Sequence, residues 1–310
     1  MPDTAVAGAL ASAEAALARA AHRGAELESP GEEARALLVS LLDVRRSWPI
    51  HHADELLAAD VVDALMRAAA KRAQGAPIQY ATGRAAFRHL TLVVDERVLI
   101  PRPETEVLVD LAIERCDGGT VVDVGTGSGC IALALATEGR FERVIATDVS
   151  SDALTVARAN AERLTASLRA RIEFREGSLL APLAGERVRM VVSNPPYISL
   201  AEAAALPALV RDWEPSIALY SQGDGMAHIN ALARDAAAAL EPGGWLLLEV
   251  DARRAGLAAE TVCEGGWYQE VAVQRDLTGR ERFVIARRCA ATTAVVPNVQ
   301  APVRAQPGAR

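Results

Sequence analysis

The sequence has few cysteines, no long apolar run and a deficit of positive charge. Its cysteines lack the spacing of a metal site, and the five histidines supply no partners for one. The four cysteines are Cys116, Cys130, Cys263 and Cys289. We therefore expect no metal site and a reduced, cytoplasmic protein. No segment reaches the length of a membrane span, and the N-terminal stretch lacks the basic start of a secretion signal.

The balance of charge narrows the class of partner. The chain carries 33 lysines and arginines against 40 aspartates and glutamates, which gives a formal net charge of -7 at pH 7. Phosphate contacts need clustered basic side chains, so a nucleic acid is not expected as the main partner. A local basic face stays open as an alternative, and it would be built from Arg84, Arg88, Arg97 and Arg102.

A glycine-rich turn in the first half of the chain predicts a ligand site. Gly125, Gly127 and Gly129 directly follow an apolar run that is expected to form a buried strand. Glycine adopts positive φ without strain and lets the backbone approach a ligand closely. Helical spacing resumes at Ile131, and Cys130 stands where a nicotinamide fingerprint has its third glycine, which disfavours a dehydrogenase. A tight strand-to-helix turn without a ligand would also favour glycine.

The next expected strand supplies a carboxylate. Residues 143–147 are apolar and β-branched, and Asp148 follows them directly. Nucleotide-binding α/β units place an acidic residue about 20 residues beyond the glycine turn, where it accepts hydrogen bonds from ribose hydroxyls. Asp148 is therefore the predicted ribose anchor, and a helix-start role before Ser150 is the alternative.

A second motif, Asn-Pro-Pro-Tyr at residues 194–197, closes a short apolar strand expected over residues 188–193. Pro195 and Pro196 cannot donate backbone hydrogen bonds, so they end the strand and stiffen the loop that holds Asn194. Ligands of open α/β sheets bind at the carboxyl ends of the strands, where the glycine turn and the predicted ribose anchor also lie. The three segments are thus expected to converge on one crevice, with a simple turn as the alternative for the motif.

The residue types in this motif suit methylation of an amide or aromatic amine nitrogen. Such a nitrogen is a poor nucleophile because its lone pair is delocalised. The Asn194 side-chain oxygen and the Pro195 carbonyl can each accept one N–H, and both acceptors strengthen as positive charge develops in the transition state. Tyr197 is expected to pack flat against the planar group. No general base is required beforehand, so positioning for in-line attack on a sulfonium methyl is the main contribution.

Three blocks of sequence carry a family resemblance: residues 98–106 (Val-Leu-Ile-Pro-Arg-Pro-Glu-Thr-Glu), 123–129, and 193–198 (Ser-Asn-Pro-Pro-Tyr-Ile). They resemble the HemK/PrmC family, bacterial S-adenosylmethionine-dependent methyltransferases that modify the glutamine of the Gly-Gly-Gln loop in peptide chain release factors. Asn-Pro-Pro-Tyr alone is shared with DNA adenine-N6 methyltransferases. The first block is more specific and differs from its version in ribosomal-protein glutamine methyltransferases. The likeness spans roughly residues 30 to 288.

The resemblance implies roles for individual residues. The methionine part of the donor would lie against Gly125, Thr126, Gly127, Ser128 and Gly129, the ribose on Asp148, the adenine near Ser178 and Leu179, and the substrate amide on Asn194, Pro195, Pro196 and Tyr197, with Asn194 also beside the donor. Three segments depart from the family pattern. Ser178 and Leu179 replace acidic or aromatic residues, Ala85 and Ala86 replace acidic ones, and residues 251–254 replace a glycine-rich segment.

The same resemblance implies a class I methyltransferase fold, an α/β protein with a Rossmann-like, doubly wound, seven-stranded sheet whose last strand is antiparallel. Strand-like segments that alternate with helical runs agree with this, and they begin near residues 120, 143, 171, 188, 244, 268 and 282. We expect a helical bundle over residues 1–75, a connector with a β-hairpin over 76–100, a catalytic domain over 101–289 and a disordered tail over 290–310. The bundle is expected to dock the partner, or alternatively to cover the catalytic domain.

Local patterns predict details of the first hundred residues. Ser29 and Glu32 are expected to form a capping box at the start of a helix. Further helical stretches are predicted over residues 53–57 and 61–72. In the connector, the alternating apolar residues after Leu90 predict one strand of the hairpin, and residues 98–100 predict the other.

The sequence therefore predicts a protein-(glutamine-N5) methyltransferase that acts on class I peptide chain release factors, with S-adenosyl-L-methionine as donor and S-adenosyl-L-homocysteine as product. An adenine-N6 nucleic-acid methyltransferase is the first alternative, and the acidic balance together with the Ile-Pro-Arg-Pro-Glu-Thr-Glu block counts against it. A non-catalytic module that binds the donor and regulates a partner is the second. The intact Asn-Pro-Pro-Tyr motif counts against that module.

Overall fold

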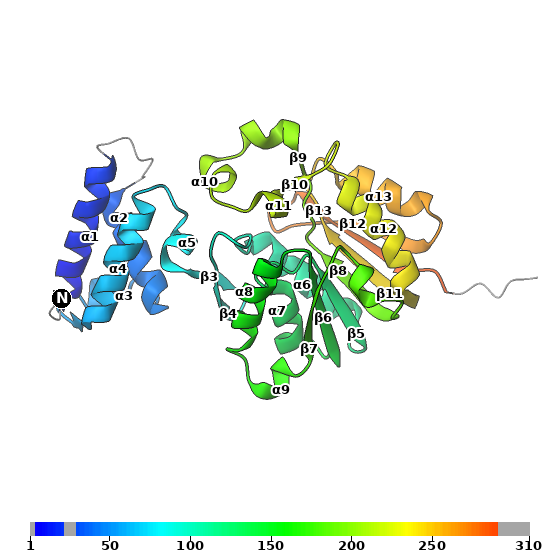
Figure 1. The fold of residues 1–310 in the computed structure, drawn as a ribbon, viewed down its shortest axis with the longest axis horizontal. Coiled ribbons are helices and arrows are strands. Elements are labelled where there is room, and N and C mark those ends of the chain that lie inside the picture. The colour runs from blue at the N-terminus through cyan, green and yellow to red at the C-terminus, as the bar shows by residue number, and fades with distance from the viewer. Residues whose placement is uncertain (1–3, 22–28, 291–310) are drawn as a thin grey trace, which may run out of the picture.

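A computed structural model describes residues 4–21 and 29–290 of the chain. A small helical bundle lies at one end of the molecule and a larger α/β part at the other (Figure 1). The tail expected over residues 290–310 lies, apart from its first residue, outside the described residues.

Three helices form the bundle: α1 (Val6–Ala21), α2 (Pro30–Leu42) and α4 (Ala59–Arg72). Each turns an apolar stripe inward, so that Leu17, Leu37 and Leu65 are fully buried in one shared core. Shorter elements complete this part of the chain: β1 (Thr4–Ala5), α3 (Trp48–His51), β2 (Leu56–Leu57) and α5 (Ile78–Thr82).

Two local predictions for the bundle are wrong. Residues 53–57 are not helical, because Leu56 and Leu57 form a strand that pairs antiparallel with Thr4 and Ala5. Ser29 is the N-cap of α2, but its side chain makes no capping hydrogen bond. The Glu32 carboxylate that was expected to complete the box instead accepts a hydrogen bond from Arg35 at 2.7 Å.

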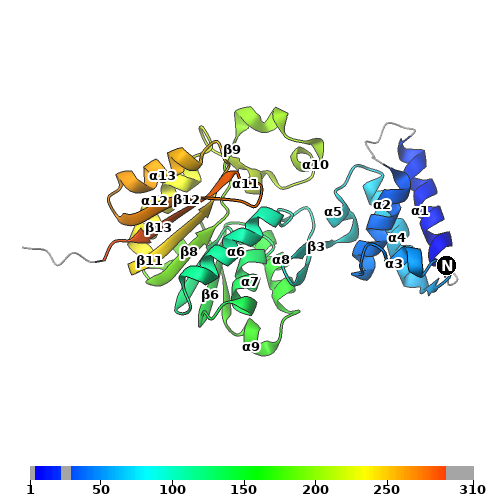
Figure 2. The ribbon, with the colours of Figure 1, turned by 180° about the vertical axis from the view of Figure 1, so that it is seen from behind.

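The connector contains a hairpin, but with one strand that the sequence did not predict. β3 (Arg84–Phe87) pairs antiparallel with β4 (Leu90–Val93), and the hairpin lies between the bundle and the larger part in both ribbon views (Figure 2). Residues 98–100 form no strand, so the prediction for them is wrong. A two-residue turn is enough to bring β3 beside β4. The Val98 carbonyl accepts a hydrogen bond from the Tyr80 hydroxyl at 2.5 Å instead of bonding a neighbouring strand.

The larger part is built on a seven-stranded sheet with the order β12-β13-β11-β8-β5-β6-β7. β13 runs antiparallel to both of its neighbours, and the remaining pairs are parallel. The doubly wound sheet with an antiparallel last strand is confirmed. The strands are β5 (Thr120–Val124), β6 (Arg143–Asp148), β7 (Ile172–Glu176), β8 (Val188–Ser193), β11 (Leu240–Glu249), β12 (Tyr268–Arg275) and β13 (Glu281–Arg288).

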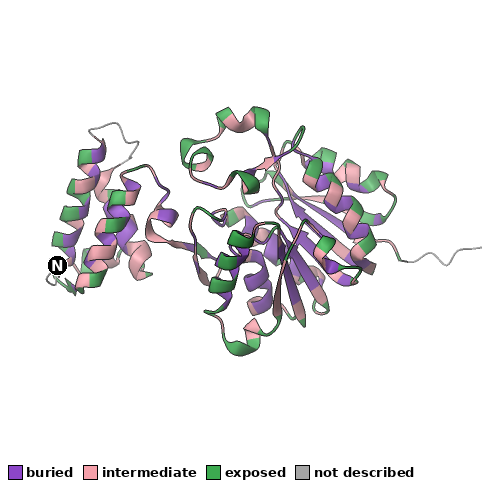
Figure 3. Ribbon diagram, viewed as in Figure 1, coloured by how far each residue is buried: buried purple, intermediate pink, exposed green. Residues whose placement is uncertain are grey.

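Helices cover both faces of this sheet. On one face lie α6 (Pro103–Arg115), α7 (Cys130–Glu138) and α8 (Ser151–Ala161), and on the other lie α12 (Ala227–Ala239) and α13 (Ala255–Glu264). Successive strand residues serve opposite faces, so Val121 packs with the first group and Val122 with the second. The central strands are accordingly mostly buried, whereas the edge strands β7 and β12 are partly exposed, and the outer faces of the helices are exposed (Figure 3). Short helices α9 (Ala166–Arg169) and η1 (Ala181–Leu183) flank β7.

The order of the strands creates a switch point between β5 and β8. From β5 the chain builds β6 and β7 on one side of the sheet and then returns to place β8 on the other, with Val124 paired to Ser193. Ligands of doubly wound sheets bind where the strand order reverses, at the carboxyl ends. An excursion of the chain follows β8 at this edge, with β9 (Ile198–Ser199), η2 (Leu200–Ala205), α10 (Ala208–Arg211), α11 (Ser216–Leu219) and β10 (Tyr220–Ser221).

Candidate active site

The glycine turn at the end of β5 is tied to the neighbouring strand. The backbone N–H groups of Gly125 and Thr126 both donate to the carbonyl of Thr147, at 2.8 and 2.9 Å. Gly125 and Gly127 have φ values of 72° and 55°, as predicted, and a Cβ at either would meet no atom within 4 Å. Backbone conformation rather than crowding therefore requires glycine, and the space beside the turn is open for a ligand.

A buried carboxylate holds this turn from the interior of the protein. Asp123 is fully buried, and its Oδ2 accepts hydrogen bonds from the Thr126 hydroxyl at 2.6 Å and the Ala132 N–H at 3.1 Å. Burial raises the pKa of Asp123 to about 7. Thr126, Ser128 and Gly129 do not line the adjoining pocket, and Thr126 and Ser128 are buried. Among the predicted donor-binding residues, these three lie behind the wall and shape the turn.

Asp148 lies at the end of β6 and faces the same space. Its two oxygens accept hydrogen bonds from the backbone N–H groups of Gly127 and Ser150, both at 2.9 Å. Burial raises its pKa, and these N–H donors oppose the rise. The N-cap of α8 is Ser150, whose hydroxyl accepts a hydrogen bond from the Ala153 N–H at 3.1 Å. Each oxygen of Asp148 keeps a second lone pair for a ligand, and its role as ribose anchor stays a prediction.

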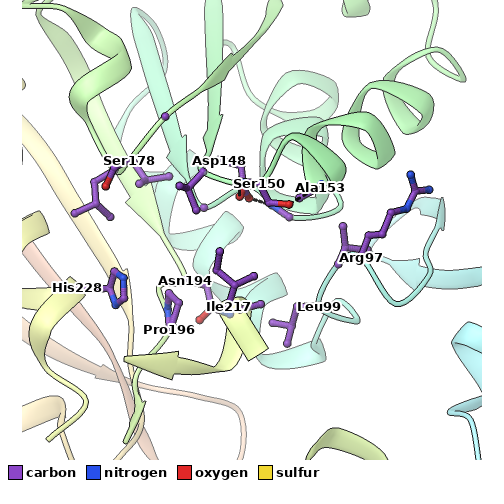
Figure 4. Close-up of a pocket in the computed structure, with 18 residues that line it drawn as sticks. Arg97, Leu99, Asp148, Ser150, Ala153, Ser178, Asn194, Pro196, Ile217 and His228 are labelled. Carbon is purple, nitrogen blue, oxygen red and sulfur yellow. Dashed lines mark hydrogen bonds between the residues drawn. The ribbon is translucent and has the colours of Figure 1, made fainter. Parts of the chain in front are cut away.

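The segment after β7 supplies the next part of the wall. Leu179 has a φ of 47°, a left-handed conformation that is unusual for leucine, and its carbonyl accepts a hydrogen bond from the Thr147 hydroxyl at 3.1 Å. Strained backbone of this kind is concentrated at functional sites. His228 in α12 lies near Ser178 at this end of the pocket (Figure 4), and its Nδ1 is 2.8 Å from the Ser221 hydroxyl. Burial lowers the pKa of His228, which keeps the imidazole neutral.

These segments enclose one cavity, which we call the glycine-turn pocket. Figure 4 shows Ser178 and His228 at one end, Arg97 at the other, and Asp148 across from Asn194 and Pro196. Its wall comprises residues of the connector, the glycine turn, the starts of α8 and α12, the segment after β7, the loop after β8 and α11: Arg97, Val98, Leu99, Val124, Gly125, Gly127, Asp148, Val149, Ser150, Ala153, Gly177, Ser178, Leu179, Asn194, Pro196, Ile217, Ala218 and His228.

A second cavity, the proline-loop pocket, adjoins the first one at the Asn-Pro-Pro-Tyr loop. Its wall consists of Leu99, Arg102, Asn194, Pro195, Pro196, Tyr197, Ile198, Val210, Ala218 and Leu219. The two pockets share Leu99, Asn194, Pro196 and Ala218, and we call the part of this common wall formed by Asn194 and Pro196 the partition. Burial raises the pKa of Tyr197 to about 12, which keeps its phenol neutral.

An ion pair fixes the rim of the proline-loop pocket. Arg102, in the loop before α6, donates to the Glu214 carboxylate at 2.6 Å, and the Glu214 side chain is almost completely buried. The pair joins the start of α6 to the segment before α11. Leu99 lines both pockets, whereas Arg102 lines only the proline-loop pocket.

Several functional candidates were missed from the sequence. Arg97, Leu99, Ile217 and His228 line the glycine-turn pocket, and Arg102 lines its neighbour. Leu99 and Arg102 belong to the block at residues 98–106, whereas Arg97, Ile217 and His228 come from segments without a recognisable motif. Cys130 begins α7, as expected, and burial raises the pKa of its thiol to about 12, so it is not a thiolate nucleophile. Within residues 4–21 and 29–290, no cluster of three or more metal-ligating side chains occurs.

Comparisons with known proteins bear on this site. Residues 103–212 match the methyltransferase small domain, and residues 9–83 match the PrmC N-terminal domain. A release factor glutamine methyltransferase from Deinococcus radiodurans is 42% identical over 267 residues, covering 85% of this chain and 93% of the relative. One from Xylella fastidiosa is 40% identical over 258 residues, covering 82% and 92%.

The chain belongs to the release factor glutamine methyltransferase family. It is a methyltransferase that uses S-adenosylmethionine, and its class I fold also occurs in a methyltransferase from Pyrococcus furiosus. That structure has a TM-score of 0.51 and 18% identity, and it covers 66% of this chain and 91% of its own. Among the described residues, no helix is both long and apolar enough to cross a membrane.

Proposed function

We propose that the protein transfers a methyl group to the side-chain amide nitrogen of a glutamine in the Gly-Gly-Gln loop of class I peptide chain release factors. The partition formed by Asn194 and Pro196 is the observation that supports this most directly. The donor then has one pocket and the glutamine the other. The two pockets adjoin at Asn194 and Pro196, where the amide nitrogen would reach the methyl group. The names of the relatives support the choice of acceptor.

The glycine-turn pocket fits the donor. Asp148 would hold the ribose, the backbone of Gly125 and Gly127 would border the methionine part, and Ser178, Leu179 and His228 would border the adenine. Asn194 and Pro196 lie across the pocket from Asp148 (Figure 4). When bound there, S-adenosylmethionine supplies an electrophilic methyl on a positively charged sulfur. The protein's part is then to place an acceptor nitrogen at the partition.

The proline-loop pocket fits a primary amide. The Asn194 Oδ1 and the Pro195 carbonyl accept the two amide hydrogens, and the neutral Tyr197 ring packs against the amide plane. Both acceptors stabilise the positive charge that develops as the nitrogen attacks, which lowers the barrier more than it strengthens binding. Fixing both hydrogens also holds the nitrogen lone pair in line with the methyl group.

Ion pairing of the candidate basic face counts against a nucleic-acid acceptor. Arg88 pairs with Glu138 and Asp110, Arg97 with Asp95, and Arg102 with Glu214. Three of the four arginines that could have formed the face thus have carboxylate partners, which reduces the charge they offer to phosphates. A non-catalytic role is disfavoured because the Asn-Pro-Pro-Tyr loop lines a pocket of its own.

We assign partner docking to the bundle and the hairpin, over residues 1–75 and 76–100, and methyl transfer to residues 101–289. The match of residues 9–83 to the PrmC N-terminal domain supports a dedicated module at this end. A cytoplasmic location follows from this proposal, because release factors act on ribosomes. The four cysteines are free thiols, which agrees with a reducing compartment.

Transfer of labelled methyl from S-adenosylmethionine tests the function. Purified release factor, its loop variant with alanine in place of the glutamine, and duplex DNA would be offered in parallel. We expect label on the intact factor and none on the variant, which would establish substrate, site and reaction together. Label on DNA alone would overturn the proposal in favour of adenine methylation.

A further inference from the structure

A buried carboxyl group without an obvious role lies beside the reacting loop. Glu249 ends β11, next to β8, where Leu248 is paired with Ser193, the residue before Asn194. The residue is 1% exposed, and its Oε2 has no hydrogen-bond partner among the described residues. Burial raises its pKa to about 7. A buried polar atom without a partner is costly, so its presence at this edge of the sheet calls for a functional explanation.

Thr105 lies between this carboxyl group and Asn194. It belongs to the first turn of α6, in the Ile-Pro-Arg-Pro-Glu-Thr-Glu block, and is 2% exposed. Its Oγ1 accepts a hydrogen bond from Asn194 Nδ2 at 3.2 Å. Hydrogen bonding by the Thr105 side chain also lowers the pKa of Glu249, against the larger effect of burial. Thr105 thus contacts Asn194 directly and lies within reach of the Glu249 carboxyl group, and we call these three side chains a row.

The chemistry of the three groups sets the direction of this row. Whether protonated or ionised, the Glu249 carboxyl group has an oxygen that can accept a hydrogen bond, and a threonine hydroxyl has one proton to donate. When that proton is directed at Glu249, the Thr105 oxygen can only accept from its other neighbour. The Asn194 amide must then present its NH2 group to Thr105, which leaves Oδ1 for the pocket. The reverse orientation would aim N–H groups at the N–H groups of the substrate amide, where no hydrogen bond forms.

We propose that Thr105 and Glu249 are positioning residues, which fix the orientation of the Asn194 amide so that its oxygen faces the substrate nitrogen. The inference rests on the proposed function, because it assigns Asn194 Oδ1 to the substrate amide. It explains which way the Asn194 amide faces, since its oxygen and its NH2 group are nearly identical in shape. Each donor in the row also polarises the next, which makes Asn194 Oδ1 a stronger acceptor as charge develops.

A pair of substitutions at Thr105 tests this. Thr105→Val keeps the shape and removes the hydroxyl, and we expect a kcat about 10 to 100 times lower, as for residues that orient a ligand or a catalytic group through a hydrogen bond. Donor Kd and release-factor KM should change less than about threefold. Thr105→Ser restores the hydroxyl and should restore most of kcat. A wild-type kcat for Thr105→Val, or equal losses in the valine and serine variants, would overturn the proposal.

Thr137→Val is the matched control. Thr137 lies in α7, and its hydroxyl bonds only carbonyls of its own helix, at Leu133 and Ala134. The same change of chemistry away from the partition should leave kcat unaltered. If Thr137→Val lowered kcat as much as Thr105→Val does, loss of any helix hydroxyl would explain the result and the proposal would fail.

A measurement without turnover separates this inference from the proposed function. The side-chain ¹H–¹⁵N signals of Asn194, assigned by their loss in Asn194→Asp, report its hydrogen bond directly. We expect slowed exchange of one amide hydrogen in the wild type and in Thr105→Ser, faster exchange in Thr105→Val, and an intermediate rate in Glu249→Gln. Equal exchange in the wild type and Thr105→Val would refute the row. Failure of the wild type to label release factor would refute the proposed function and leave this result standing.

Discussion

Buried carboxyl groups are treated differently in the bundle and in the catalytic part. Glu33 in α2 is buried between helices, and both of its oxygens accept hydrogen bonds from Arg72 in α4, at 2.6 and 2.8 Å. In the catalytic part, Asp123, Glu214 and Glu249 are also buried, and each keeps one oxygen without a hydrogen-bond partner among the described residues. In the bundle, both oxygens of the Glu33 carboxylate are satisfied by Arg72. In the catalytic part, three carboxyl groups each keep one oxygen that is free to accept a hydrogen bond.

The number of hydrogen-bond partners distinguishes a buried carboxylate that stabilises the fold from carboxyl groups that are available to the site. A paired carboxylate holds two helices in register and has little left to offer a ligand. The three carboxyl groups with a free oxygen lie under the glycine turn, at the rim of the proline-loop pocket and behind Asn194, and burial raises the pKa of each. Perturbed, incompletely partnered groups of this kind are typical of active sites. The comparison predicts opposite consequences when the carboxylates are removed one by one.

Removal of Glu33 should have the largest effect on stability. Glu33→Ala leaves the Arg72 guanidinium buried without its partner, which typically costs about 3–5 kcal/mol. Denaturant unfolding would measure the loss. The double variant Glu33→Leu/Arg72→Met removes both charges together and should recover most of it. If the single variant were as stable as the wild type, the closed pair would not be what holds α2 to α4.

Asp148 lies between the two extremes, because backbone N–H groups hold it but leave lone pairs free. Asp148→Ala removes a charged acceptor of two ribose hydrogen bonds, so donor binding should weaken by about 2–4 kcal/mol. Calorimetry with S-adenosylmethionine measures this. The control is Asp152→Ala in the exposed first turn of α8, which should keep wild-type affinity. Unchanged affinity for the Asp148 variant would mean that the ribose binds elsewhere.

Asn194 should affect the chemical step more than binding. Asn194→Ala removes an acceptor that strengthens in the transition state, and we expect methyl transfer to fall by a factor of about 100 or more. Donor affinity should change far less, because the remaining wall of the glycine-turn pocket is intact. Single-turnover transfer to release factor gives the rate, and calorimetry gives the affinity. Turnover equal to that of the wild type would remove Asn194 from the mechanism.

The sequence predicted the framework of the site because that framework is local. A strand, a glycine turn and a helix follow one another at residues 120–138, and two prolines end β8, so neighbouring residues carry the whole signal. The general rule for parallel sheets then brings the carboxyl ends of β5, β6 and β8 together. The site residues predicted on these segments do meet at one edge, and their individual roles remain predictions.

What could not be predicted depends on contacts between distant segments. His228 and Glu249 reach the site only because α12 and β11 pack beside β8, and neither belongs to a motif. The prediction of a helix over residues 53–57 failed for the same reason, since Leu56 and Leu57 are paired with Ala5 and Thr4, far earlier in the chain. Tertiary pairing overrides a weak local preference in such short segments.

The smallest expected effect concerns the pH dependence of stability. Burial raises the pKa of Glu249 from its ordinary value of 4.5 to about 7, so between these values the unfolded chain is ionised while the folded protein keeps the proton. The unfolded state then binds fewer protons, and stability falls as pH rises through this window. Glu249→Gln removes this dependence, so relative to the wild type it should gain about 1–3 kcal/mol between pH 4.5 and 7.5.

The raised pKa of Asp123 makes the same contribution to the pH dependence of the wild type and of Glu249→Gln. Only the difference between the stability curves of these two proteins therefore reports on Glu249. Urea unfolding at several pH values would give these curves. Glu260→Gln, at an exposed position of α13, is the control, and its stability curve should run parallel to that of the wild type. Parallel curves for Glu249→Gln as well would mean that this carboxyl is already satisfied in the folded protein. The contrast with Glu33 would then disappear, because an ionised, fully partnered Glu249 would be as closed on itself as the pair in the bundle.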